Sequence, residues 1–215
     1  VKNNLFNIST NYKKNTLCYI SRIPPLFYEY TMYKNINKIK KKYAVWQVKL
    51  FEFCLELITN LKNYCLSSNI NLNIIGAMKN SEIESNCYKN LLGEKNWSFI
   101  PQGGPLSSYE KIDKFEILVN PMSTLGYEAI ARGKKVAFFS MDHCAGANFG
   151  WPLINEKKGH FFSNSCDESE IYRIINYLFR LRDEEWKKSI SIYEKKLFFY
   201  DEDNSKLKNF LKNYS

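Results

Sequence analysis

The sequence lacks the residue patterns that hold structural metals or disulfide frameworks. Its six cysteines form no C-x-x-C pair, and neither of its two histidines stands at zinc-finger spacing. Cys18, Cys54 and Cys65 fall within apolar strand or helix patterns, where a free thiol behaves as a small hydrophobic group. We therefore expect reduced cysteines, a cytoplasmic location, and neither a metal ion nor any other cofactor.

Targeting and membrane-spanning patterns are also lacking. The sequence does not open with a signal peptide, and it contains no apolar run near the length that crosses a bilayer. No internal repeat or low-complexity linker divides it. The 215 residues therefore fit one large domain with a sizeable core. The chain begins at Val1 rather than at methionine, which allows it to be a piece of a longer polypeptide.

The formal charge of +9 raises the question of a polyanionic partner. Basic residues are spread through the chain, apart from one cluster at Lys38, Lys40, Lys41 and Lys42. We expect this cluster to be a solvated face or loop, since a single run of charge is weak evidence of binding. The alternative is a peripheral contact with the anionic headgroups of the inner membrane. No recognised nucleic-acid motif is present, so we expect no nucleic-acid partner.

Apolar, β-rich runs alternate with helical patterns along the chain. Strands are predicted at 16–20, 72–75, 97–100, 115–119 and 135–139, with a short sixth at 160–162. Helices are predicted at 44–65, 81–92, 107–114, 124–132, 167–181 and 184–200. Strands separated by long helical segments pair in parallel through right-handed crossovers. The predicted fold class is α/β, a doubly wound, Rossmann-like parallel sheet with a helical C-terminal tail.

The pattern also gives boundaries for this domain. We expect residues 1–15 to be a peripheral N-terminal segment, residues 16–200 to form the Rossmann-like domain, and residues 201–215 to be a C-terminal tail. In an open parallel sheet, ligands bind beyond the carboxyl ends of the strands. The loops that follow the predicted strands are therefore the places to search for a site.

The loop after the fourth strand has the composition of an anion site. Ser123 is a natural N-cap for the following helix, and the first N–H groups of a helix attract anions. Gly126 lacks a side chain where a phosphate would approach the backbone. Thr124 and Glu128 are four residues apart and share a helix face, so the carboxylate can accept hydrogen bonds from ribose hydroxyls. The alternative is an ordinary cap followed by a solvated glutamate.

Residues 123–136 resemble the donor-site strand–helix–strand segment of GT-B glycosyltransferases. More narrowly, they are similar to bacterial surface carbohydrate (capsule and lipopolysaccharide) biosynthesis proteins. The resemblance continues through the segments 150–153, 159–162, 185–186 and 200–204 and covers about the last half of the chain. It implies a C-terminal, donor-binding half in which Glu128 holds ribose, and Ser123 and Thr124 hold phosphate. Met122, where an acidic or small residue is expected, departs from the family pattern.

Two further positions are candidates for substrate binding. Arg22 follows the first strand and can hold a phosphate through two parallel hydrogen bonds; the alternative is a surface arginine. Asp142 and His143 follow the fifth strand and could contact the sugar or transfer a proton; a plain polar loop is the favoured interpretation. No catalytic base is assigned, because in GT-B enzymes the acceptor and usually the base come from the other lobe.

The leading hypothesis is a glycosyltransferase that moves a sugar from a nucleotide-sugar to a glycan or glycolipid acceptor of a surface polysaccharide or lipopolysaccharide. The resemblance implies that the acceptor lobe lies largely outside this chain. One alternative is a nucleotide-sugar 2-epimerase, which shares the GT-B architecture. The other is a non-catalytic basic domain that binds nucleic acid or a membrane surface through the lysine cluster.

Overall fold

The computed structural model describes residues 12–22, 26–27, 29–30, 41–104, 107–141, 149–150, 154 and 156–197. Its centre is a six-stranded sheet in the order β3-β2-β1-β4-β5-β6, in which every neighbouring pair is parallel. The strands are β1 (Lys13–Ile20), β2 (Leu72–Ile75), β3 (Trp97–Ile100), β4 (Phe115–Asn120), β5 (Lys135–Phe139) and β6 (Phe162–Ser163). This order is that of a doubly wound, Rossmann-like fold, as the sequence predicts.

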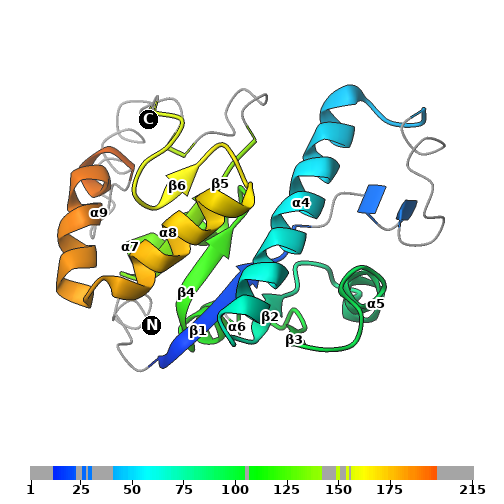
Figure 1. Cartoon of the computed structure of the whole chain (residues 1–215), viewed down its shortest axis with the longest axis horizontal. Helices are drawn as coiled ribbons and strands as arrows, with labels where there is room; N and C mark the ends of the chain where they lie inside the picture. The colour runs from blue at the N-terminus through cyan, green and yellow to red at the C-terminus, as the bar shows by residue number, and fades with distance from the viewer. Residues whose placement is uncertain are drawn as a thin grey trace, which may run out of the picture.

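Helices cover both faces of this sheet. They are α4 (Val45–Ser67), α5 (Ser81–Leu92), α6 (Ser107–Ile112), α7 (Thr124–Ala131), α8 (Glu168–Arg180) and α9 (Asp183–Leu197). Helices α4 and α8 pack against each other in front of the sheet in Figure 1, and α6 and α7 pack against β4 from behind. Helix α9 stands beyond the β6 edge, and α5 lies at the opposite side, near β3 (Figure 1).

The central strands form the core because their side chains are apolar on both faces. Leu17 of β1 pairs with Leu72 of β2 on one side and with Ile117 of β4 on the other, and all three are fully buried. Such continuous apolar runs are typical of strands that helices cover on both sides. Burial raises the pKa of the Cys18 thiol within β1, so this group stays neutral and acts as a packing group.

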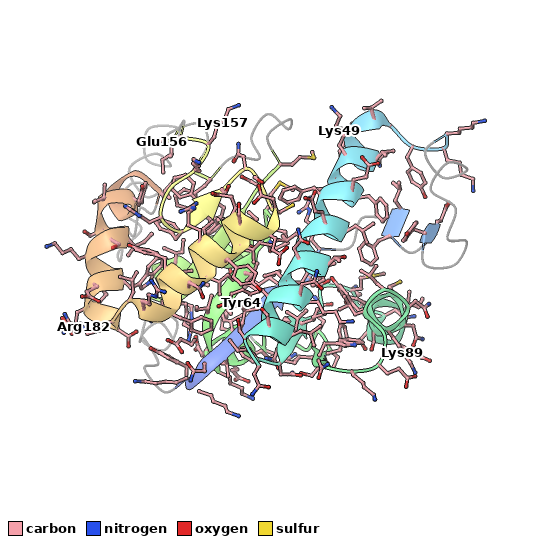
Figure 2. All side chains as sticks on the ribbon, viewed as in Figure 1. Lys49, Tyr64, Lys89, Glu156, Lys157 and Arg182 are labelled. Atoms are coloured by element: carbon pink, nitrogen blue, oxygen red, sulfur yellow. The ribbon has the colours of Figure 1, made fainter. Side chains whose placement is uncertain are left out.

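The seam between α4 and α8 combines apolar packing with one polar contact. Tyr64 of α4, labelled in Figure 2, packs edge-on against Tyr172 with ring centroids 4.9 Å apart. Its hydroxyl donates to Oδ1 of Asn176 at 2.8 Å, so the buried polar tip has a partner. This contact fixes α8, which follows β6, against the helix that follows β1.

Several boundaries differ from the sequence-based prediction. Strand β1 begins at Lys13, and the sixth strand lies at Phe162–Ser163 rather than at 160–162. The N-cap of α8 is Asp167, whose carboxylate accepts from the N–H of Glu170 at 2.9 Å, so the helix proper begins at Glu168 rather than at 167. Among the described residues, no helix is long and apolar enough to cross a membrane.

Candidate functional site

The strand order places a topological switch point between β1 and β4. From β1 the chain passes to α4 on one face of the sheet, and from β4 it passes to α7 on the other face. The two connections therefore diverge at the carboxyl ends of these strands, the place where ligands of open α/β sheets bind. The residues that follow β1 are Ser21 and Arg22, and those that follow β4 are Pro121, Met122 and Ser123.

The turn after β4 is held by a buried amide. Asn120 ends the strand and is fully buried; its Nδ2 donates to the carbonyl of Ser123 at 3.0 Å, and its Oδ1 accepts from the N–H of Ser123 at 3.1 Å. Between them, Met122 adopts a left-handed backbone conformation with φ of 60°. That conformation is unfavourable for a long side chain, so the Asn120 bonds hold a strained turn. Met122, which departs from the family pattern, is thus the residue whose backbone is strained.

Helix α7 begins as the sequence predicts. The Ser123 hydroxyl accepts from the N–H of Leu125 at 3.3 Å and is the N-cap. Thr124, the first helical residue, is exposed, and Ser123 is half-buried. The start of α7 is therefore accessible to a ligand, and its N–H groups give it a partial positive charge.

Gly126 has a structural role that the sequence did not indicate. A Cβ atom added there would lie 2.2 Å from both Cγ and Nδ2 of Asn120. The missing side chain therefore makes room for the Asn120 amide that holds the turn. A close approach of phosphate to the Gly126 backbone stays a prediction.

Glu128 is exposed one turn after Thr124, on the side of α7 that meets α6. Its Oε2 accepts a hydrogen bond from the Tyr109 hydroxyl at 2.7 Å. This bond to a carboxylate, together with partial burial, raises the pKa of Tyr109, so the phenol keeps its proton and remains the donor. The Arg132 guanidinium lies 5.2 Å from the centroid of the Tyr109 ring, which fixes the ring that orients Glu128.

Arg22 is brought to the same turn from across the switch point. Its Nη1 donates to the carbonyl of Met122 at 3.2 Å, although the two residues are 100 positions apart in the chain. The structure thus brings together Arg22, Ser123 and Thr124 at one edge of the sheet, with Glu128 one helical turn away. Asp142 and His143 lie outside the described residues, as do Lys38 and Lys40 of the lysine cluster.

A buried carboxylate beside the switch point was missed by the sequence-based prediction. Glu84 of α5 is fully buried and accepts from the N–H groups of Ala77 at 3.0 Å and Met78 at 2.8 Å. It also accepts from the Ser21 hydroxyl, whose oxygen lies 2.8 Å from that of Tyr88. Glu84 therefore ties the loop after β2 to the end of β1. Its signal in the sequence is its spacing, because Glu84 shares a helix face with the buried residues three and four positions later.

Within the part of the chain that the structure describes, no three His, Cys, Asp or Glu side chains gather as a possible metal site. The fold and the residues at its switch point define the chain as a Rossmann-like α/β domain with polar groups at the carboxyl edge of β1 and β4.

Comparison with known proteins identifies the family. The model of the family described as "putative O-antigen biosynthesis protein" matches residues 1–215, and the chain belongs to that family. No curated protein sequence matches it. Among solved structures, the glycosyltransferase TarM is similar, with a TM-score of 0.51 at 15% identity. The match covers 97% of this chain but 36% of TarM, so the chain spans little more than a third of that protein's length, and the likeness is one of fold.

Proposed function

We infer that this chain is the donor-binding part of a glycosyltransferase that acts in the synthesis of surface polysaccharide of the O-antigen type. The donor is a nucleotide-sugar, and the architecture is that of the C-terminal half of a GT-B enzyme. One observation carries the proposal: Arg22 and the exposed start of α7 meet at the β1/β4 switch point of the sheet. Membership of an O-antigen biosynthesis family supports the glycan acceptor.

The donor phosphates bind at the start of α7. The helix dipole and the N–H groups next to Thr124 attract negative charge, and the Ser123 cap holds the helix start in place. Arg22 supplies a full positive charge. Its guanidinium has five N–H donors, and the bond to Met122 uses one of them, so it can hold its position on the turn while others reach a phosphate oxygen.

The nucleoside ribose binds at Glu128. The Tyr109 hydroxyl bonds to one oxygen of this carboxylate, and a carboxylate accepts several hydrogen bonds at once. The ribose hydroxyls can therefore donate to Glu128 while Tyr109 keeps its orientation. The spacing of one turn from Thr124 keeps this negative charge away from the phosphates, which it would otherwise repel.

These contacts give a limited affinity. The helix start contributes about 0.3–2 kcal/mol, and charge-assisted bonds to Glu128 and Arg22 contribute roughly 1.5–3 kcal/mol each. A mid-range sum of about 5.7 kcal/mol corresponds to a dissociation constant of roughly 0.07 mM. Tighter binding requires packing against the base and contacts from a second lobe, which in a GT-B enzyme also brings the acceptor and usually the catalytic base.

Saturation-transfer NMR with UDP, GDP and CMP tests the proposal on the full chain. We expect saturation transfer to at least one nucleotide, and a loss of about tenfold or more in affinity in both Glu128→Gln and Arg22→Gln. The matched controls Glu184→Gln and Arg180→Gln remove the same charges from exposed positions on α9 and α8 and should bind as the wild type does. No transfer to any nucleotide at millimolar concentration, or equal losses in the controls, would rule the proposal out.

A further inference from the structure

The first turn of α4 exposes two large apolar side chains. Val45 is 72% exposed and Trp46 is 56% exposed, although large apolar residues are usually covered in a folded domain. The other two tryptophans in the described part of the chain are covered more fully, since Trp97 is half-buried and Trp186 is buried. An indole that is apolar in body and polar at its N–H is suited to a membrane–water interface.

Exposed lysines flank these two side chains on both sides in the sequence. Lys41 and Lys42 precede the helix, Lys49 lies within its first two turns, and all three are exposed. The first turn of α4 contains no acidic residue. Two acidic residues lie near these lysines. Glu29 pairs with Lys42 at 3.4 Å, and Glu52 lies three positions after Lys49 in α4. We call the set Lys41, Lys42, Val45, Trp46 and Lys49 the α4 tip.

The α4 tip stands at the carboxyl edge of the sheet. Helix α4 follows β1 and runs back across the sheet, so its first residues lie where the parallel strands end. Figure 1 shows this end of α4 at the same end of the molecule as the arrowheads of the strands, and Figure 2 places Lys49 there. A surface that binds the α4 tip would therefore face the edge that carries Arg22 and the start of α7.

We propose that the α4 tip docks on a bilayer that contains anionic lipid, with Trp46 and Val45 inserted at headgroup depth and the lysines bound to lipid phosphates. The occupant follows from charge complementarity: exposed apolar residues flanked by exposed lysines match an apolar layer beneath negative headgroups. A protein partner would bury the same Trp46 without requiring anionic lipid. The docking is independent of nucleotide binding, so either can fail while the other holds.

Co-sedimentation of the full chain with vesicles tests this docking. We expect binding to phosphatidylcholine vesicles that contain about one-third phosphatidylglycerol, weaker binding as salt is raised, and little binding to phosphatidylcholine alone. Lys41→Gln with Lys49→Gln should lower the partition coefficient by about 25-fold, or about fivefold per lysine. Lys187→Gln with Lys188→Gln, which removes the same charge from exposed positions on α9, should change it by less than about twofold.

The contribution of Val45 and Trp46 to docking is tested with a second variant and its own control. Val45→Ser with Trp46→Ser should lower the partition coefficient by roughly tenfold or more, because both side chains then lose their insertion into the headgroup region. Leu66→Ser changes a side chain that is 46% exposed at the opposite end of the same helix and should have no effect on partition. Equal binding to neutral and anionic vesicles, or equal losses in the controls, would overturn the proposal. So would a Trp46-dependent self-association in light scattering without any vesicle binding, which would make the tip a protein interface.

Discussion

The turn that presents the start of α7 can be tested through the contact between Gly126 and Asn120. Gly126→Ala places a Cβ atom 2.2 Å from the Asn120 amide, far inside van der Waals contact. The amide must then move, and both of its hydrogen bonds to the Ser123 backbone are disturbed. Overpacking costs about 1–3 kcal/mol, and a buried polar group left without a partner costs about 1–3 kcal/mol. We expect Gly126→Ala to lower the free energy of unfolding by about 3 kcal/mol.

A double-mutant cycle separates this contact from other causes. Asn120→Ala removes the two amide atoms at 2.2 Å but leaves the Asn120 Cβ atom 2.7 Å from the added methyl group. Gly126→Ala should therefore cost about 1–2 kcal/mol less in the Asn120→Ala background than in the wild type. The assay is urea unfolding of the four proteins, followed by circular dichroism. Costs that add to within about 0.5 kcal/mol would show that Gly126 and Asn120 do not act through each other.

Two other predictions concern the buried groups Glu84 and Lys134. Glu84→Gln should lower the free energy of unfolding by about 2–4 kcal/mol, because the charge-assisted bonds to Ala77 and Met78 weaken. The control Glu82→Gln changes an exposed residue of the same helix and should alter this free energy by less than about 0.5 kcal/mol. Equal effects of the two substitutions in urea unfolding would contradict the role of Glu84. Burial lowers the pKa of Lys134 to about 8, below the value of about 10.4 for an unfolded lysine. Between these values the unfolded chain binds a proton that the folded chain does not, so this group adds stability as pH rises. The free energy of unfolding of the wild type minus that of Lys134→Met should increase from about pH 8 to pH 10, and a flat difference would contradict the depressed pKa.

Much of the fold follows from local sequence patterns. β2 and β3 lie at the predicted residues, because an asparagine before each short run and a glycine or proline after it fix both ends of the strand. The sixth strand is displaced from its prediction because its position depends on pairing with β5, where Phe138 opposes Phe162. A register set by a neighbouring strand cannot be read from the run itself.

The candidate site also combines local features, which the sequence predicts, with long-range contacts, which it does not. The Ser123 cap is a local feature, and the sequence predicts it. Two other contacts are not local. Arg22 bonds to the carbonyl of Met122, and the Ser21 hydroxyl bonds to Glu84. Each contact joins segments far apart in the chain, which only the assembled sheet brings together. The sequence indicated Gly126 for its lack of a side chain but could not show that Asn120 occupies the space.

The most direct test of the account is the position of a bound nucleotide. Backbone amide NMR of the isotopically labelled chain, titrated with the nucleotide that gives the strongest saturation transfer, reports which N–H groups the phosphates approach. We predict the largest shifts at Thr124, Leu125 and Arg22, with smaller shifts at Glu128. Shifts confined to the opposite edge of the sheet, near the start of β4 and β5, would show that the switch point is not the site.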